Sequence, residues 1–246
     1  MKQTVTKLLM LCLIAMGLTA CDGIGSLASN AKVTDADNDQ VVFVGDSIFA
    51  LSGELQDFLE DYAGETFRRY TISGAEITGG IYATDIATQF KNARRDNPNI
   101  DIVVMDGAGN DILIPVITMF DWYNCKTEWY QWWGLSSTCK SLIDNLYVEV
   151  VNVLNDMHAS GVDKVIYLGY YYPKNALLWL DDVEEAVDYG DMRLAQACRN
   201  SAANCTFIDP RSKINDRDII LDGIHPATSG SRKLADLVWP VLQPHL

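Results

Sequence analysis

Basic residues and histidines are scarce in this sequence of 246 residues. It holds 19 lysine and arginine residues against 33 aspartate and glutamate residues, which gives a formal net charge of -14 at pH 7. A surface of this charge repels nucleic acid and anionic lipid headgroups, so we expect no nucleic-acid partner. The three histidines are scattered and no Cys-x-x-Cys pair occurs, so we expect neither a metal site nor a cofactor.

Long apolar runs are also missing, apart from one near the N-terminus. Residues 8–18 are apolar, follow Lys2 and Lys7, and form a run too short to span a bilayer comfortably. The run leads into Leu-Thr-Ala-Cys, ending at Cys21, which resembles the lipobox of bacterial lipoproteins. The resemblance implies a signal peptide over residues 1–20 and a lipid on Cys21. We therefore expect an exported, membrane-anchored lipoprotein that faces the periplasm or the cell surface. An ordinary signal peptide with a chance cysteine is the alternative.

Cysteine is the one chemically reactive residue type that favours a particular compartment. Of the six cysteines, four lie well beyond the signal and lipid positions: Cys125, Cys139, Cys198 and Cys205. Disulfides between them would suit an oxidising compartment such as the periplasm. The simplest pairing is local, Cys125 with Cys139 and Cys198 with Cys205. Three pairings are possible, however, and the sequence alone does not choose among them.

The remaining chain is long enough for one sizeable core. Residues 21–40 are rich in Asp, Asn, Ser and Gly and show no hydrophobic periodicity, which predicts a flexible tether. From Val41 onward, short apolar runs alternate with longer amphipathic segments. Residues 41–246 are therefore predicted to form a single domain.

Alternation of strands and helices predicts the fold class. Strand-like apolar runs occupy residues 41–44, 67–72, 102–105, 165–168 and 206–208. Apolar positions at helical spacing mark residues 51–62, 81–95, 143–157 and 234–242, the last with a bend expected at Pro240. This order predicts an α/β fold, a three-layer α/β/α sandwich of flavodoxin-like type with a central parallel sheet of about five strands.

Small polar residues follow three of the predicted strands. In a parallel sheet these positions share one edge, where ligands usually bind. Ser47 follows the first strand directly and precedes a helix, so its hydroxyl is exposed and its N–H lies at a helix N-terminus. Nucleophilic serine chemistry also needs a base, and donors for the charge that develops on a carbonyl oxygen.

A base and donors are available. Asp222 and His225 are three residues apart, so a tight turn brings the carboxylate to Nδ1 of the ring and leaves Nε2 free to face Ser47. Gly74 offers a backbone N–H, because the missing side chain lets a substrate oxygen approach. Asn110 offers a side-chain amide.

Taken in order, these stretches resemble the four sequence blocks of the SGNH, or GDSL, hydrolases. The matching stretches are GDSI at 45–48, ISGAE at 72–76, AGND at 108–111 and DGIHP at 222–226. The resemblance implies a carboxylic ester hydrolase, an esterase or lipase with nucleophile Ser47 and a triad completed by Asp222 and His225. It also implies that Ser47, Gly74 and Asn110 form the oxyanion hole. One residue departs from the family pattern, since Ala108 stands where glycine is usual.

Aromatic residues are candidates for lining the substrate site. Residues 121–133 hold four tryptophans, and Tyr170 and Tyr171 follow a predicted strand. The candidate lining residues are Trp122, Tyr123, Trp129, Tyr170 and Tyr171. Aromatic faces suit sugar rings or acyl chains, although the same rings can pack on the domain itself. We expect a small substrate, a short acyl or acetyl ester carried on lipid or glycan. The alternatives are acyl transfer to a sugar or lipid alcohol, and a non-catalytic glycan-binding surface lipoprotein.

Overall fold

The computed structural model describes residues 32–79, 83–117, 121–127, 134–175 and 180–246. The expected signal peptide and the lipidation position Cys21 lie outside these residues. Within them, none of the helices combines the length and the apolar character needed to cross a membrane.

A five-stranded parallel sheet forms the middle of the domain. Its strands are β1 (Val41–Val44), β2 (Arg68–Arg69), β3 (Ile102–Met105), β4 (Lys164–Leu168) and β5 (Cys205–Ile208). They lie in the order β2-β1-β3-β4-β5, and every neighbouring pair is parallel. This is a doubly wound order: β2 is added on one side of β1, and β3, β4 and β5 are added on the other. The strand order therefore reverses between β1 and β3, and doubly wound sheets bind their ligands at this point.

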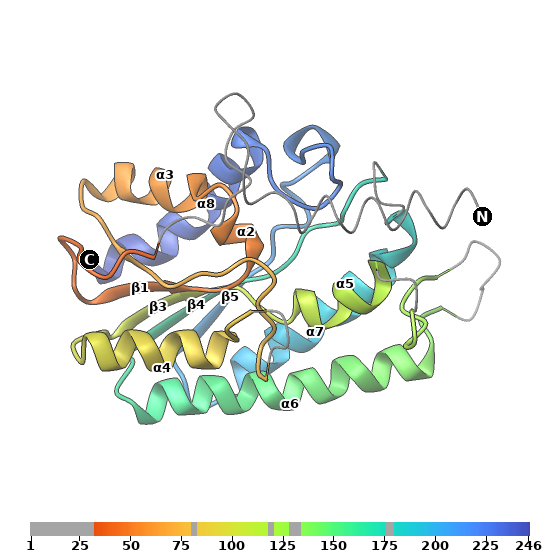
Figure 1. Cartoon of the computed structure of the whole chain (residues 1–246), viewed down its shortest axis with the longest axis horizontal. Helices are drawn as coiled ribbons and strands as arrows, with labels where there is room; N and C mark the ends of the chain where they lie inside the picture. The colour runs from red at the N-terminus through yellow and green to blue at the C-terminus, as the bar shows by residue number, and fades with distance from the viewer. Residues whose placement is uncertain (1–31, 80–82, 118–120, 128–133, 176–179) are drawn as a thin grey trace.

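Helices cover both faces of the sheet (Figure 1). The helices are α2 (Ser47–Ala50), α3 (Glu54–Ala63), α4 (Ile86–Asp96), α5 (Gly109–Ile117), α6 (Ser137–Ala159), α7 (Glu184–Asn200) and α8 (Thr228–Leu242). Short 3-10 turns occupy Asp181–Val183, Asp216–Asp218 and Gln243–His245. α3 and α8 lie above the sheet in Figure 1, and α4, α6 and α7 lie below it, which confirms the predicted three layers.

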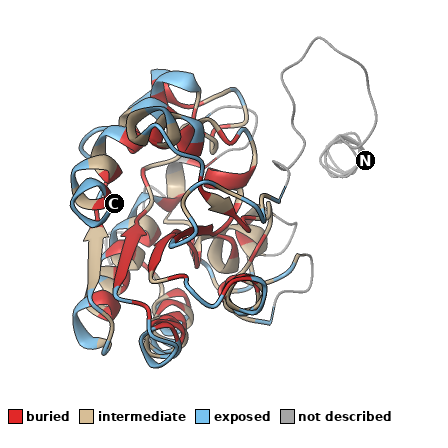
Figure 2. Cartoon of the chain, turned by 90° about the vertical axis from the view of Figure 1, so that its left-hand side faces the viewer, coloured by how far each residue is buried: buried red, intermediate tan, exposed pale blue. Residues whose placement is uncertain are grey.

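Alternate residues of each strand point to opposite faces, and both faces are buried. Val42 and Val44 belong to the core shared with α4, α6 and α7, whereas Val41 and Phe43 belong to the core shared with α3 and α8. The central strands are accordingly buried throughout, and exposed residues lie on the outer faces of the helices (Figure 2). Burial on both faces explains why these strands read as continuous apolar runs in the sequence.

The structure shifts several predicted boundaries. The predicted strand 67–72 is a regular strand only at Arg68–Arg69, although the Tyr70 and Ile72 N–H groups still donate to the carbonyls of Phe43 and Gly45. The predicted helix 81–95 begins at Ile86, because the Asp85 side chain caps it by accepting from the Thr88 N–H. The last helix starts at Thr228, well before residue 234, and continues through Pro240.

The end of the expected tether lies against the domain. Val33 pairs with Arg69 in an antiparallel bridge, with both N–H to O distances at 3.0 Å. Asn38 also donates to the Thr66 carbonyl. Contacts with the sheet therefore begin before the boundary predicted at Val41.

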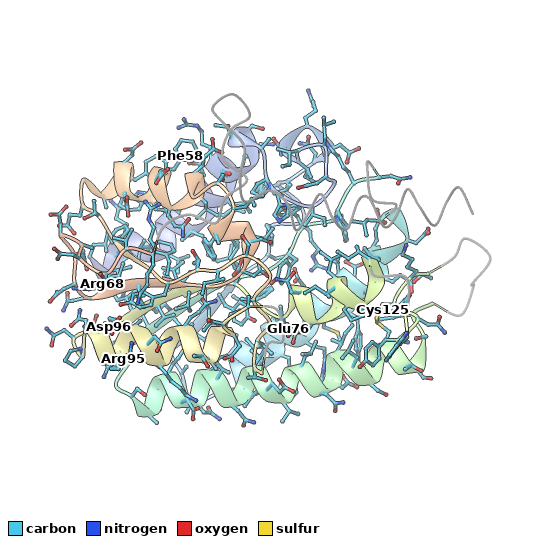
Figure 3. All side chains as sticks on the ribbon, viewed as in Figure 1. Phe58, Arg68, Glu76, Arg95, Asp96 and Cys125 are labelled. Carbon is cyan, nitrogen blue, oxygen red and sulfur yellow. A yellow bond between two sulfur atoms is a disulfide. The ribbon has the colours of Figure 1, made fainter. Side chains whose placement is uncertain are left out.

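Charged side chains gather at the amino ends of the strands. Figure 3 shows Arg68, Arg95 and Asp96 at this end of the molecule and Cys125 at the other. Hydrogen bonds from Lys32, Tyr70 and Arg95, together with the charge of Lys32, hold the pKa of Asp96 at about 2. The residues of these ion pairs thus lie at the opposite end of the strands from the carboxyl edge of the sheet.

Candidate active site

Ser47 lies where β1 stops and α2 begins. It is the first residue of α2, and Asp46 caps the helix by accepting the Ile48 N–H at 2.9 Å. Gly45 has a φ of 155° and lies so close to Asp106 that a Cβ would fall 1.9 Å from Asp106 Oδ1. Glycine is therefore required at position 45, and the sharp turn it allows presents the Ser47 side chain at the carboxyl edge.

Three side chains from two distant parts of the chain form one hydrogen-bonded series. Ser47 Oγ lies 2.8 Å from His225 Nε2, and His225 Nδ1 lies 2.6 Å from Asp222 Oδ2. The turn predicted from their spacing is present, since the other oxygen of Asp222 accepts the N–H groups of Ile224 and His225. Asp222 can accept only from Nδ1–H, so the series fixes the tautomer in which Nε2 accepts from the serine hydroxyl.

The Asp222 carboxylate is stabilised in its charged form. Burial alone would raise the pKa of Asp222, but the hydrogen bond and charge of His225, together with the two backbone N–H groups, outweigh burial and lower it. The carboxylate is thus ionised at neutral pH and can stabilise a protonated imidazole next to it.

The loop after β4 holds the histidine turn in place. The Tyr171 hydroxyl donates to the Ile224 carbonyl at 2.6 Å, and the Lys174 N–H donates to the Gly223 carbonyl at 2.9 Å. Gly223 itself has a φ of 89°, which favours glycine at the turn. The position of His225 therefore depends on the loops that follow the neighbouring strands β4 and β5.

Asn110 lies beside Ser47, and Gly74 lies one residue from a partner of Asn110. Ser47 and Asn110 line the same cavity. The Asn110 side-chain amide donates one N–H to the Ala75 carbonyl at 2.9 Å, which leaves its second N–H for another acceptor. Gly74 adopts a φ of 81°, and a Cβ there would meet only Ala83, at 4.0 Å. The space beside its backbone is therefore open.

Ala108 keeps the backbone geometry that the departure from the family pattern put in question. Its φ is 75°, the left-handed conformation that glycine adopts more easily. The next residue, Gly109, has no room for a side chain, because a Cβ would lie 2.5 Å from Tyr170 Cζ. The tight loop before α5 therefore forms with alanine in the first position of this block.

Two residues at the site, Gln89 and Asp106, and the linking role of Tyr170 were missed from the sequence. The Tyr170 hydroxyl donates to Asp46 Oδ2 at 2.7 Å and accepts the Gly109 N–H at 3.0 Å, so it joins the loops that carry Ser47 and Asn110. Gln89 accepts the Gly45 N–H and donates to the Gly45 carbonyl. Asp106 Oδ1 accepts the Asp46 N–H at 2.6 Å. A carboxylate directly after the apolar run 102–105 was the available signal for Asp106.

Asp106 is fully buried beside a second carboxyl group. Burial raises the pKa of Asp106 well above its ordinary value, and the charge of Asp46 raises it further. Two carboxylates this close do not both ionise readily, so burial and the charge of Asp46 both favour the protonated form of Asp106.

The aromatic candidates divide into two groups. Tyr170 and Tyr171 line the cavity next to Ser47. Trp122 and Tyr123 do not: Trp122 is 76% exposed, and Tyr123 packs against a small core that includes Leu135 and the cavity residue Val116. Neither of the two is among the described residues that line this cavity, so their contact with substrate stays a prediction. Trp129 lies outside the described residues.

The disulfides explain where residues 121–127 lie. Cys125 pairs with Cys139 at the start of α6, and Cys198 pairs with Cys205, with Cα–Cα distances of 5.1 Å and 5.2 Å. The structure thus has the local pairing among the three that the sequence left open. The first bridge ties Cys125 to the N-terminal end of α6, beside the small core into which Tyr123 packs.

A cavity of about 100 Å³ adjoins the serine. It extends from Ser47 and Asn110 between α5, α6 and α7, and its wall is mostly apolar. Among the described residues, no three His, Cys, Asp or Glu side chains are grouped so as to hold a metal ion.

Comparison with known proteins identifies the fold. No protein-family model and no curated protein matches this sequence. A carbohydrate acetylesterase family member from Sinorhizobium meliloti matches at 14% identity with a TM-score of 0.57, over 83% of this chain and 98% of that chain. A carbohydrate esterase family 3 protein from Talaromyces cellulolyticus matches at 17% identity and a TM-score of 0.57, over 83% and 96%. A protein from Slackia heliotrinireducens described as a candidate SGNH hydrolase matches at 15% and 0.53, over 82% and 97%. The chain therefore has the fold of the SGNH hydrolases.

Proposed function

We propose that this protein hydrolyses carboxylic esters through an acyl-enzyme on Ser47. The observation that carries the proposal is the series Ser47–His225–Asp222, in which a hydroxyl, an imidazole and a carboxylate are joined by contacts of 2.8 Å and 2.6 Å. A hydroxyl becomes a useful nucleophile at neutral pH when an adjacent base accepts its proton and a third group orients that base.

The first half-reaction transfers the acyl group to the enzyme. Ser47 Oγ attacks the ester carbonyl carbon while its proton passes to His225 Nε2. The tetrahedral intermediate collapses when the imidazolium gives that proton to the leaving alkoxide, and an alcohol departs. In the second half-reaction His225 takes a proton from water as the water oxygen attacks the acyl-enzyme. The imidazolium then returns that proton to Ser47 Oγ as the bond to the acyl carbon breaks, which releases the acid and regenerates the serine.

Donors for the developing oxyanion come from three loops. The second N–H of the Asn110 amide, the Ser47 N–H at the start of α2 and the Gly74 N–H are the groups we assign to this role. The contact of Asn110 with Ala75 supports the assignment, because it orients the amide without using both of its hydrogens. Loss of one such donor in serine hydrolases costs roughly 10²–10³-fold in kcat.

The structural neighbours support the same reaction class. Proteins named as a carbohydrate acetylesterase family member, a carbohydrate esterase and a lipase share this fold over most of their length. Their names cover carbohydrate esterases and a lipase, so they favour ester hydrolysis in general rather than one substrate.

The test is ester hydrolysis by purified protein, with p-nitrophenyl acetate and butyrate. We expect Ser47→Ala to lower kcat/KM at least 10³-fold, because the nucleophile is lost. Ser52→Ala is the matched control, since Ser52 is exposed and its hydroxyl only accepts the Glu54 N–H. Covalent labelling of the wild type by a fluorophosphonate, absent in Ser47→Ala, is the second readout. Wild-type activity in folded Ser47→Ala protein would rule the proposal out.

We also propose that the protein is exported and anchored by lipid at Cys21. The lipobox-like sequence supports this, and the two disulfides are compatible with an oxidising compartment. Expression in bacteria with radiolabelled palmitate tests it, since Cys21→Ser should abolish incorporation and release the protein from membranes. Equal incorporation by both proteins would contradict the anchor.

A further inference from the structure

The cavity beside Ser47 extends beyond the reacting atoms. One end is lined by Ser47 and Asn110, and the other is enclosed by side chains of three helices. Ile112 and Val116 come from α5, Ile143 from α6, and Leu194 from α7. Most of its wall thus comes from α5, α6 and α7, and Ile224 of the histidine loop also contributes.

The wall of this cavity suits hydrocarbon rather than a polar group. Each of the three charged side chains that line it has a partner: Asp46 Oδ2 accepts from the Tyr170 hydroxyl, Asp191 Oδ1 accepts the Tyr170 N–H at 3.0 Å, and Arg193 pairs with Asp144 at 2.9 Å. Burial raises the pKa of Asp191 to about 7, which reflects how little water reaches it. A sugar ring would find few hydrogen-bond partners here, and its hydroxyls would lose those of water.

The size of the cavity exceeds what an acetyl group requires. Its volume of about 100 Å³ is several times the ~10–15 Å³ that a cavity needs to hold one water molecule. A methyl group would therefore leave most of the cavity unfilled, whereas a chain of several methylenes would replace weak hydration with packed contacts.

We propose that the cavity between α5, α6 and α7 binds the acyl chain of the substrate and makes the enzyme select acyl groups of about four to eight carbons over acetyl. This inference rests on the proposed ester hydrolysis at Ser47. With the carbonyl carbon at Ser47 Oγ and its oxygen toward Asn110, the chain extends between Ile112 and Leu194, and the alcohol leaves toward His225.

Gly190 on α7 is the residue we assign to setting the chain length. It lines the cavity, and a Cβ added there would meet only Ile112 Cδ1, at 3.9 Å, which is ordinary van der Waals contact. Because the space next to Gly190 is open on the cavity side, a larger residue would fill the cavity without a backbone clash. Replacing a helix-interior glycine also favours the helix, so such variants should fold.

The experiment measures kcat/KM for p-nitrophenyl esters from acetate to decanoate. For the wild type we expect kcat/KM to rise up to about fourfold for each methylene that enters the cavity, with a maximum between butyrate and octanoate. In Gly190→Leu we expect the hexanoate value to fall at least 10-fold while acetate stays within about threefold, as four fewer carbons can be buried. Ile112→Ala enlarges the cavity and should move the maximum to longer chains. Arg199→Leu, an exposed position on the same helix, is the matched control and should leave the profile unchanged.

Two results would overturn the inference. One is a wild-type profile that is highest with acetate and falls with every added carbon. The other is a Gly190→Leu profile that parallels that of the wild type. A separate binding measurement distinguishes the cavity from the chemistry: hexanoate should raise the Tm of Ser47→Ala protein more than acetate does, and Gly190→Leu in that background should remove the difference. Hexanoate binding without hydrolysis of any ester would disprove the proposed function and leave the cavity assignment standing. Ester hydrolysis without this chain selectivity would support the proposed function and disprove the cavity assignment.

Discussion

Ser47 Oγ and His225 Nε2 are 2.8 Å apart, although 178 positions separate them in the chain. Ser47 lies at the end of the turn that follows β1, and His225 lies in the loop between β5 and α8. Both loops leave the carboxyl edge of a parallel sheet. In the loop after β4, Tyr170 donates a hydrogen bond to the first of them and Tyr171 donates one to the second. The contact is therefore held by the sheet and not by local sequence.

Substitution of the triad members should give unequal losses. His225→Ala removes the base, so we expect kcat to fall about as far as in Ser47→Ala. Asp222→Asn keeps the shape but disturbs the tautomer and removes a charge, so we expect a smaller fall, on the order of 10²–10⁴-fold, with KM little changed. Steady-state kinetics on p-nitrophenyl butyrate measures both. Equal losses would show that Asp222 does more than orient the ring.

Asp106 should tolerate an amide but not an apolar side chain. Its Oδ1 accepts the Asp46 N–H, and its raised pKa favours the neutral form. Asp106→Asn should retain kcat within about threefold, because an amide oxygen still accepts that N–H. Asp106→Leu leaves a buried N–H without a partner and should cost about 1–3 kcal/mol of unfolding free energy. Urea unfolding and kinetics on the two variants check this. If Asp106→Asn were as damaging as Asp106→Leu, an ionised carboxylate would be needed instead.

The stability of the fold should decrease between about pH 4 and pH 7. Burial raises the pKa of Asp111 from 3.8 to about 7, partly opposed by its acceptance of the Ile77 N–H. In this window the folded state keeps a proton that the unfolded state has lost, so unfolding becomes easier as pH rises. The effect of this group is at most on the order of 4 kcal/mol, at about 1.4 kcal/mol per pKa unit.

Asp111→Asn isolates this contribution. The amide oxygen can still accept the Ile77 N–H but does not titrate, so the variant should lose less stability than the wild type between pH 5 and pH 7.5. Thermal unfolding at several pH values measures the difference. Asp101, whose pKa burial also raises but which lies at the opposite edge of the sheet, gives a matched comparison through Asp101→Asn. Parallel curves for the wild type and Asp111→Asn would contradict the assignment.

Loss of the Cys125–Cys139 bridge should destabilise the protein more than it harms the chemistry. The bridge closes a segment with a sequence separation of 14, for which loop entropy predicts about 3 kcal/mol. For a domain of this size that corresponds to a fall in Tm of about 6–12 °C. We expect the double variant Cys125→Ser/Cys139→Ser to show this shift by calorimetry and to keep kcat on acetate esters within a few-fold below its Tm. A large loss of kcat in folded protein would place the segment at the active site after all.

The sequence by itself determined the layers and the local chemistry. Runs such as 41–44 and 102–105 are apolar throughout because both faces of those strands are buried, and this burial is visible in composition alone. The turn that brings Asp222 to His225 was predictable for a similar reason, since it needs only three residues of chain and a glycine. A short turn of this kind is determined by the residues that form it, so the sequence of those residues is enough to predict it.

Only the tertiary structure decided which further residues join the predicted triad at the carboxyl edge and which do not. Asp106 and Gln89 look like ordinary polar residues until packing removes water from them and puts them against Gly45 and Asp46. Trp122 looked like a binding residue, yet it is exposed and lines no part of the cavity. The cavity itself lies among side chains of α5, α6 and α7, so no single stretch of sequence contains it. Long-range contacts and cavities depend on how the folded helices and strands pack against one another. That packing is not visible in the local sequence pattern of any one element.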